Sequence, residues 1–179
     1  MRVGRFLEMI PINSAWHNKI EVKKGDYGEN IVQRHFEKQG YLIYKSISDG
    51  AHPFDFLCVN NKETFFVEVK TKAKRNKYPD TGFNLRHYKI YKEYCERESK
   101  RMYICFVDPV LNKVYGNFLD ILDKERIITD EVGRRLYPSI ETARYNSVGT
   151  EIIYFHLSVM EHVADLTKEQ LNDLQKIYS

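Results

Sequence analysis

The sequence predicts a mixed α/β fold, in which a central sheet has helices packed on its faces. The main observation is the order of the predicted elements between residues 25 and 108, namely helix, three strands, helix, strand. Such an order places helices against a mixed sheet. The chain has 179 residues, of which 42% are hydrophobic, so it is about one domain long and can fill a sizeable core. A second full domain is not expected.

The first predicted element is an amphipathic helix that begins near Asp26 and ends at Gly40. A short acidic side chain such as that of Asp26 can accept hydrogen bonds from the first turn of a helix, and glycine commonly follows the last turn. The residues that recur at helical spacing are Ile31, Val32, His35 and Phe36. Residues 1–24 show no clear period and are expected to form an N-terminal arm.

Three strands are predicted at residues 41–46, 53–59 and 64–71, because these runs are rich in aromatic and branched side chains. The turn residues Asn60, Asn61 and Lys62 separate the second run from the third. Turn chemistry between two such runs is typical of an antiparallel hairpin.

The second half of the predicted core is a helix over residues 83–100 and an apolar strand over residues 102–107. Residues 25–108 are thus taken as the core, and residues 109–179 as a C-terminal extension packed on the same domain. In the extension we expect a strand at 114–118, a short helix at 129–137 and a strand at 151–159 that joins the main sheet. A last helix is predicted after Thr167, which can form a capping box with Gln170.

The cysteines and the apolar runs indicate the compartment. Cys58, Cys95 and Cys105 have neither the spacing of a zinc site nor that of a disulfide framework. A reducing, cytoplasmic setting is therefore expected. No signal peptide and no apolar stretch of ~18 residues is seen, so no membrane partner is expected.

Three charged residues of the predicted hairpin carry the functional prediction. Asp55 lies in the second strand, and Glu68 and Lys70 are two residues apart in the third, so the latter two project from the same face. Two carboxylates in an apolar setting are costly without a cation. Mg²⁺ prefers such oxygen ligands and keeps water and phosphate oxygens in its shell. The sequence therefore predicts a magnesium site at Asp55 and Glu68.

A magnesium site of this kind is suited to phosphodiester hydrolysis. Lys70 can orient or deprotonate the attacking water, or can neutralise charge on the phosphorane, and the sequence leaves these roles open. Glu29, on the first helix directly after Gly28, is placed to reach the same site, because glycine permits close packing.

These residues resemble the PD-(D/E)XK nuclease superfamily. The segment Pro53-Phe54-Asp55 stands for the first part of the motif, with one extra residue between proline and aspartate, and Glu68-Val69-Lys70 stands for the second part. The branch that it resembles most is that of Holliday-junction resolvases and restriction-endonuclease-like proteins. The runs that carry this likeness are KKGDYGENIVQRHFEKQGY and EVKTK.

The resemblance implies a restriction-endonuclease-like fold and a metal-dependent deoxyribonuclease, expected to be an endonuclease on branched or duplex DNA. It makes Asp55 and Glu68 metal ligands, Lys70 the catalytic lysine and Glu29 an accessory acid, and Val69 can add its backbone carbonyl to the metal. Mn²⁺ is expected to substitute for Mg²⁺. A homodimer is a further implication of the resemblance, and no nucleotide cofactor is expected.

The charge distribution is consistent with a nucleic-acid partner. The net charge of +3 is the sum of +1 for residues 1–67, +6 for residues 68–101 and −4 for residues 102–179. The basic third directly follows the motif and can contact phosphates without reading sequence. The expected DNA contacts are His52, Lys72, Lys74, Arg75, Lys77 and Arg86, with Tyr78, Phe83 and Tyr88 interleaved.

Several alternatives stay open from the sequence. Glu68 and Lys70 can belong to the solvent face of an edge strand, where charge is common. Glu29 can serve the helix dipole alone, and His52 can cap its loop. The whole chain can be an inactive nuclease-like fold that binds nucleic acid or protein, or it can cut RNA instead of DNA.

Overall fold

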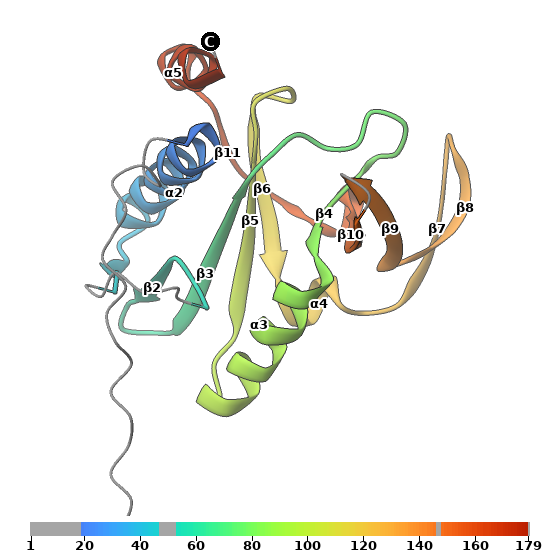
Figure 1. The fold of residues 1–179 in the computed structure, drawn as a ribbon. Coiled ribbons are helices and arrows are strands. Elements are labelled where there is room, and N and C mark those ends of the chain that lie inside the picture. Colours follow the sequence, from blue (N-terminus) through green and yellow to red (C-terminus); the bar gives the residue numbers. More distant parts are fainter. Residues whose placement is uncertain (1–18, 47–52, 146–147, 179) are drawn as a thin grey trace, which may run out of the picture.

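The computed structural model describes residues 19–46, 53–145 and 148–178, which form a mixed six-stranded sheet with helices on both faces (Figure 1). Its strand order is β1-β2-β3-β5-β6-β11. The pairing of β3 with β5 is parallel, and the other pairings in this sheet are antiparallel. The bounds are β1 Leu42–Tyr44, β2 Phe56–Val59, β3 Thr64–Thr71, β5 Met102–Asp108, β6 Lys113–Phe118 and β11 Glu161–Asp165. The predicted fold class is confirmed.

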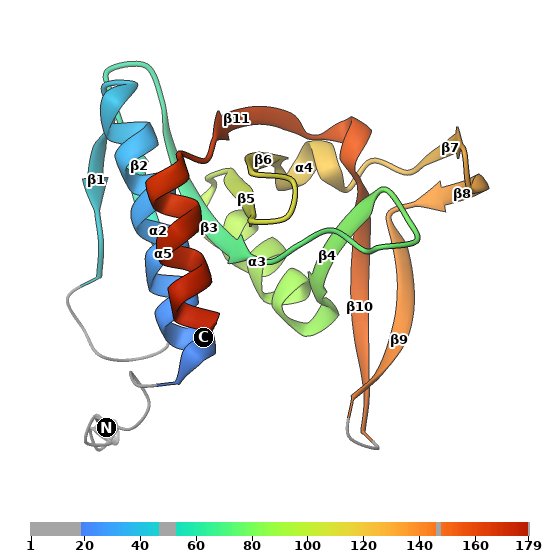
Figure 2. The ribbon, with the colours of Figure 1, turned by 90° about the horizontal axis from the view of Figure 1, so that it is seen from above.

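Helices cover the sheet, and a second sheet packs beside it. Helices α2 (Ile20–Lys38) and α5 (Lys168–Tyr178) lie side by side on one face, and α3 (Leu85–Glu98) lies on the other (Figures 1 and 2). The remaining elements are β4 (Asp80–Asn84), β9 (Ser139–Tyr145) and β10 (Val148–His156) in a three-stranded sheet, the hairpin β7 (Arg126–Asp130) and β8 (Gly133–Tyr137), α4 (Leu119–Leu122) and the 3₁₀ turn Leu157–Val159.

Strand β3 separates two cores because its side chains alternate between the two faces of the sheet. Phe65, Val67 and Val69 pack in the cluster beneath α2 and α5. Phe66 packs in the opposite cluster, with aromatic residues of α3 and the second sheet. Glu68 and Lys70 share the face of Phe66, so two charged side chains follow an apolar one into the region under α3.

Several predicted elements differ from the structure. The strand predicted at 53–59 begins only at Phe56, so Asp55 lies just before it. Helix α2 begins at Ile20 instead of Asp26, because nothing within residues 20–25 interrupts the helix and Gly25 is tolerated inside it. The strand predicted at 151–159 is β10, which pairs with β4 and β9 and does not join the main sheet. The helix predicted at 129–137 is the β7–β8 hairpin, because the backbone at Gly133 has a φ of +122° that no helix can accommodate.

Helix α2 approaches β3 closely at Gly28. A Cβ atom at this position would lie 1.8 Å from the Thr71 hydroxyl oxygen, which is far inside contact distance. Only glycine allows this approach, which brings the next residue, Glu29, to the end of β3 that carries Lys70. The role predicted for Gly28 is thereby confirmed.

The C-terminal helix begins as predicted. The Thr167 hydroxyl accepts a hydrogen bond from the Gln170 backbone N–H, and the Gln170 side chain accepts one from the Thr167 N–H, at 3.2 and 2.8 Å. This reciprocal pair is a capping box. Within the residues described, no helix is long and apolar enough to span a bilayer.

Candidate active site

Asp55 is fixed at the start of the β2–β3 hairpin. Its backbone N–H donates to the Val67 carbonyl at 3.0 Å, and its carboxylate Oδ2 accepts from the Val69 N–H at 2.6 Å. The second bond ties the Asp55 side chain to the backbone of β3 between Glu68 and Lys70. Two predicted site segments are therefore in direct contact.

Glu68 and Lys70 lie on a central strand. Strand β3 is paired on both sides, by β2 and β5, so the alternative that these residues sit on an edge strand is wrong. The side chain of Glu68 is buried, with 5% of the residue exposed. The Lys70 ammonium forms an ion pair with Glu68 Oε1, so one positive charge accompanies the buried carboxylate.

Tyr91 of α3 completes the surroundings of Glu68. Its hydroxyl donates to Glu68 Oε1 at 2.6 Å, and the residue is 4% exposed. Burial and the neighbouring Glu68 carboxylate raise the pKa of Tyr91, so the hydroxyl keeps its proton. From the sequence, Tyr91 is one apolar position of a helix, and only the packing of α3 on β3 reveals its contact with Glu68.

The carboxylates of the site repel one another. Burial, followed by the charges of Glu68 and Glu29, raises the pKa of Asp55 to about 8. Burial also raises the pKa of Glu29, whose neighbours include Glu68, Lys70 and Lys45. Glu29 therefore lies within electrostatic reach of Glu68 and Lys70, and the predicted role of Glu29 at a metal stays a prediction.

The residues present fit a hard divalent cation. Asp55 and Glu68 supply carboxylate oxygens, and burial, followed by the neighbouring carboxylates, disfavours the ionised form of Asp55 when no cation is bound, as its raised pKa indicates. Within residues 19–46, 53–145 and 148–178, no three His, Cys, Asp or Glu side chains come together as a metal-binding group. A cation at Asp55 and Glu68 would thus need backbone, water or substrate oxygens to complete its shell.

The predicted DNA contacts are divided by the structure into engaged and exposed groups. The Lys72 ammonium donates to the Gly82 carbonyl at 2.7 Å, and burial lowers its pKa. The Lys74 ammonium donates to the Arg75 carbonyl at 3.1 Å. Lys77 and Arg86 are exposed on the surface. His52 lies outside the described residues.

Arg75 is engaged in a second cluster of charges, here called the Arg75 cluster, which consists of Arg75, Asp80, Tyr137 and Glu141. Arg75 donates twice to Asp80, at 2.6 and 2.5 Å, and to Glu141 at 2.7 Å. The Tyr137 hydroxyl donates to Asp80 at 2.8 Å. Asp80 is fully buried, and the cluster joins the loop after β3 to the second sheet.

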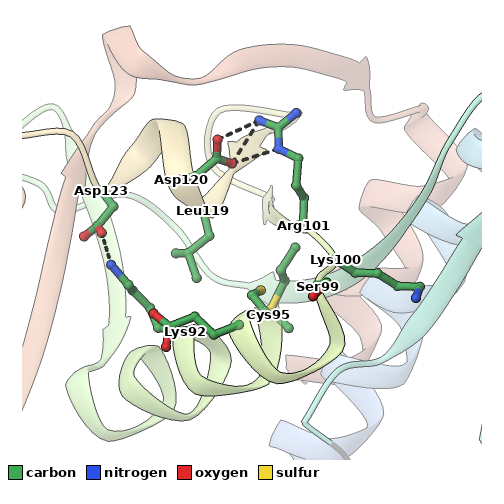
Figure 3. Close-up of a pocket in the computed structure, with 10 residues that line it drawn as sticks. Lys92, Cys95, Ser99, Lys100, Arg101, Leu119, Asp120 and Asp123 are labelled. Carbon is green, nitrogen blue, oxygen red and sulfur yellow. Dashed lines mark hydrogen bonds and ion pairs between the residues drawn. The ribbon is translucent and has the colours of Figure 1, made fainter.

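A pocket of about 460 Å³ lies away from the carboxylates, between α3 and α4 (Figure 3). Its rim holds the ion pairs Lys92–Asp123 and Arg101–Asp120. Met102, which lines it, begins β5, whereas Lys70 is in register with Phe106 farther along that strand. None of Asp55, Glu68 and Lys70 lines the pocket, so it is separate from the candidate site.

No protein-family model and no curated protein sequence matches the chain. Among solved structures, the fold is similar to that of Hjc, a Holliday junction resolvase from the archaeal hyperthermophile Archaeoglobus fulgidus. The two share 11% identity with a TM-score of 0.49, over 79% of this chain and 93% of the resolvase. A likeness of this size says nothing about activity, and the proposal that follows rests on the geometry of the site.

Proposed function

We propose that this protein is a metal-dependent nuclease that hydrolyses phosphodiester bonds of DNA. The observation that supports it is the pair Asp55 and Glu68, held together at a central strand with Lys70 beside them. Burial and the neighbouring carboxylates raise the pKa of Asp55, and the buried Glu68 has one lysine beside it. Such a group is typical of a catalytic site.

The proposed roles follow from the position of each group. Asp55 and Glu68 would hold Mg²⁺ or Mn²⁺, with the Val69 carbonyl as a further oxygen. The cation would polarise the phosphoryl oxygen and lower the pKa of a bound water. Lys70, whose ammonium lies against Glu68, is placed to orient or deprotonate that water or to neutralise phosphorane charge. Glu29 would act as an accessory acid that adds negative charge beside the cation.

The proposed substrate contacts lie on the basic segment after β3. Lys77 and Arg86 are exposed and can bind phosphates directly. Lys72, Lys74 and Arg75 hold the loop in place through the hydrogen bonds described above. We therefore expect the exposed cations to set the affinity for DNA, and the hydrogen-bonded cations to fix the shape of the loop.

The test is cleavage of plasmid, linear duplex and four-way-junction DNA with Mg²⁺, with Mn²⁺ and with EDTA. We expect cleavage only with a divalent cation, and its loss in the Asp55→Ala and Lys70→Ala proteins. The control is Asp120→Ala, which removes an exposed aspartate that pairs with Arg101 away from the site. Equal cleavage in all variants would rule out the proposal.

A matched RNA substrate decides between DNA and RNA. Preferential cleavage of RNA under the same conditions would keep the site assignment and change the substrate. Binding that survives EDTA, together with no cleavage under any metal, would instead identify an inactive nuclease-like fold that serves as a binding module.

A further inference from the structure

The β7–β8 hairpin lies beside the loop that follows β3, on the side of the molecule far from α2 and α5 (Figures 1 and 2). A small pocket of about 250 Å³ separates the hairpin from residues 77–78 of the loop. We call this pocket and its rim the outer groove. Its lining residues are Lys77, Tyr78, Asp130, Val132, Gly133, Arg134, Arg135 and Tyr137.

The hairpin is held firmly on the side that faces the groove. Tyr137 is bonded to Asp80, Arg135 pairs with Glu141 at 2.9 Å, and Asp130 pairs with His156 at 3.0 Å. A two-stranded hairpin alone is only marginally stable in water. These anchors therefore present the outer groove as a fixed surface.

Cationic groups collect at the outer groove around one aromatic ring. The Arg135 guanidinium lies 4.3 Å from the centroid of the Tyr78 ring, and the Lys77 ammonium lies 5.6 Å from it. Arg134 and Lys77 are exposed, and neither forms an ion pair within the part of the chain that the structure describes. Two cations at the rim are thus available to a ligand.

Two carboxylates, those of Asp130 and Glu131, lie near the groove, and they differ in the partners that they already have. Asp130 is occupied by His156 and by the turn N–H groups of Val132 and Gly133, at 2.8 and 3.2 Å. Glu131, at the tip of the hairpin, is exposed. It adds a negative charge beside the groove that would oppose an anionic ligand.

We propose that the outer groove binds the phosphate backbone of nucleic acid beyond the cleavage site, with Lys77 and Arg134 as the phosphate contacts. The choice of nucleic acid as ligand rests on the proposed function. Exposed lysine and arginine beside an aromatic ring suit phosphates, and backbone contacts of this kind position a duplex without reading its sequence. The loop of residues 72–79 connects β3, which carries Glu68 and Lys70, directly to this groove.

The test compares two double variants with the same change of net charge. Lys77→Glu/Arg134→Glu alters the outer groove, whereas Lys62→Glu/Lys168→Glu alters exposed lysines on the β2–β3 turn and on α5. Binding to a fluorescent four-way junction with long arms is measured by anisotropy in EDTA, so that no cleavage is needed. Circular dichroism melting checks that each variant folds.

We expect the groove variant to bind the junction at least about 10-fold more weakly than wild type. The slope of log affinity against log salt concentration should also become shallower, by the amount that about two phosphate contacts contribute. The control variant should bind like wild type. Glu131→Gln should strengthen binding about 2-fold, because it removes the opposing charge.

The failures are distinguishable. If wild type cleaves DNA but the groove and control variants bind equally well, the outer groove assignment falls and the proposed nuclease stands. If wild type does not cleave but the groove variant loses binding, the nuclease falls and the groove stands. Ile127 and Leu136 are exposed apolar side chains of the same hairpin. If Ile127→Ser/Leu136→Ser abolishes a dimer while the groove variant binds normally, the hairpin is a self-association surface and the assignment is overturned.

Discussion

The candidate site and the Arg75 cluster are built from the same groups and differ in how completely the charges are paired. Each has a buried carboxylate, a cation and a tyrosine hydroxyl: Glu68 with Lys70 and Tyr91, and Asp80 with Arg75 and Tyr137. In the Arg75 cluster a guanidinium contacts Asp80 twice and also binds Glu141.

The candidate site, in contrast, brings the three carboxylates of Asp55, Glu68 and Glu29 near only two lysines, Lys70 and Lys45. Asp55 and Glu29 both have a raised pKa there, and each counts Glu68 among the charges that raise it. A buried structural charge needs the complete pairing that is seen in the Arg75 cluster. A group of carboxylates with too few cations, in contrast, is stabilised when a cationic ligand binds. This difference supports the proposal that a cation binds at the candidate site and not at the Arg75 cluster.

The largest expected effect is that of Asp55→Asn on cleavage. Neutralising this ligand should reduce the rate at least about a thousand-fold, since the cation and its bound water lose their position. The protein should remain folded, because the substitution also removes charge repulsion. Single-turnover cleavage of junction DNA measures the rate, and a rate within a few-fold of wild type would remove Asp55 from the site.

Arg75→Ala should lower the stability of the fold, whereas Asp55→Asn should lower the rate of cleavage. It leaves Asp80 buried without its cation, which should lower the free energy of unfolding by about 3 to 5 kcal/mol. Denaturation in urea measures this change. A variant as stable as wild type that has lost DNA affinity would show that Arg75 binds phosphate and that the cluster is dispensable for the fold.

The two tyrosines provide a matched pair. Tyr91→Phe should weaken binding of Mn²⁺ about 10-fold, because Glu68 loses a donor that orients its carboxylate. Tyr137→Phe removes an equivalent bond to Asp80 and should cost about 1 kcal/mol of stability without changing the affinity for Mn²⁺. Titration calorimetry with each protein decides, and equal affinities in both variants would contradict the distinction between the clusters.

A further expected effect is a pH dependence of stability. The pKa of Asp55 rises from 3.8 in the unfolded chain to about 8 in the folded protein, so between these values the unfolded chain releases the proton first. The contribution of Asp55 to the free energy of unfolding therefore falls as pH rises from about 4 to about 8. Divalent cation should reverse this fall, because it favours the ionised carboxylate.

The measurement is the difference in unfolding free energy between wild type and Asp55→Asn at pH 5 and pH 8, in EDTA and in Mg²⁺. At pH 8 in EDTA, Asp55→Asn should have a larger free energy of unfolding than wild type. Mg²⁺ should reduce this difference between the two proteins. A gap that does not vary with pH would mean that Asp55 is ionised throughout.

The hairpin that holds Asp55, Glu68 and Lys70 could be predicted because its information is local. Residues 64–71 are so rich in aromatic and branched side chains that the predicted bounds of β3 are those observed. Tyr91 could not be recognised, because its role depends on α3 packing over β3. The engagement of Arg75 was likewise hidden, since its partner Glu141 lies 66 residues away along the chain.

The β7–β8 hairpin had a local signal that the helical interpretation missed. Asp130 accepts hydrogen bonds from the N–H groups of Val132 and Gly133, which is the behaviour of a turn aspartate. The preceding Ile127, Ile128 and Thr129 are β-branched and favour a strand. An aspartate followed three residues later by glycine, after such a run, indicates a hairpin more strongly than a helix.

The last segments of the chain to be synthesised, β11 and α5, belong to the core beneath β3. Leu166 and Leu174 belong to the same buried cluster as Val67 and Val69, on the underside of the strand that carries Glu68 and Lys70. A ribosome releases the β2–β3 hairpin long before these leucines. The buried cluster beneath Glu68 and Lys70 is therefore complete only after residues 161–178 have emerged from the ribosome.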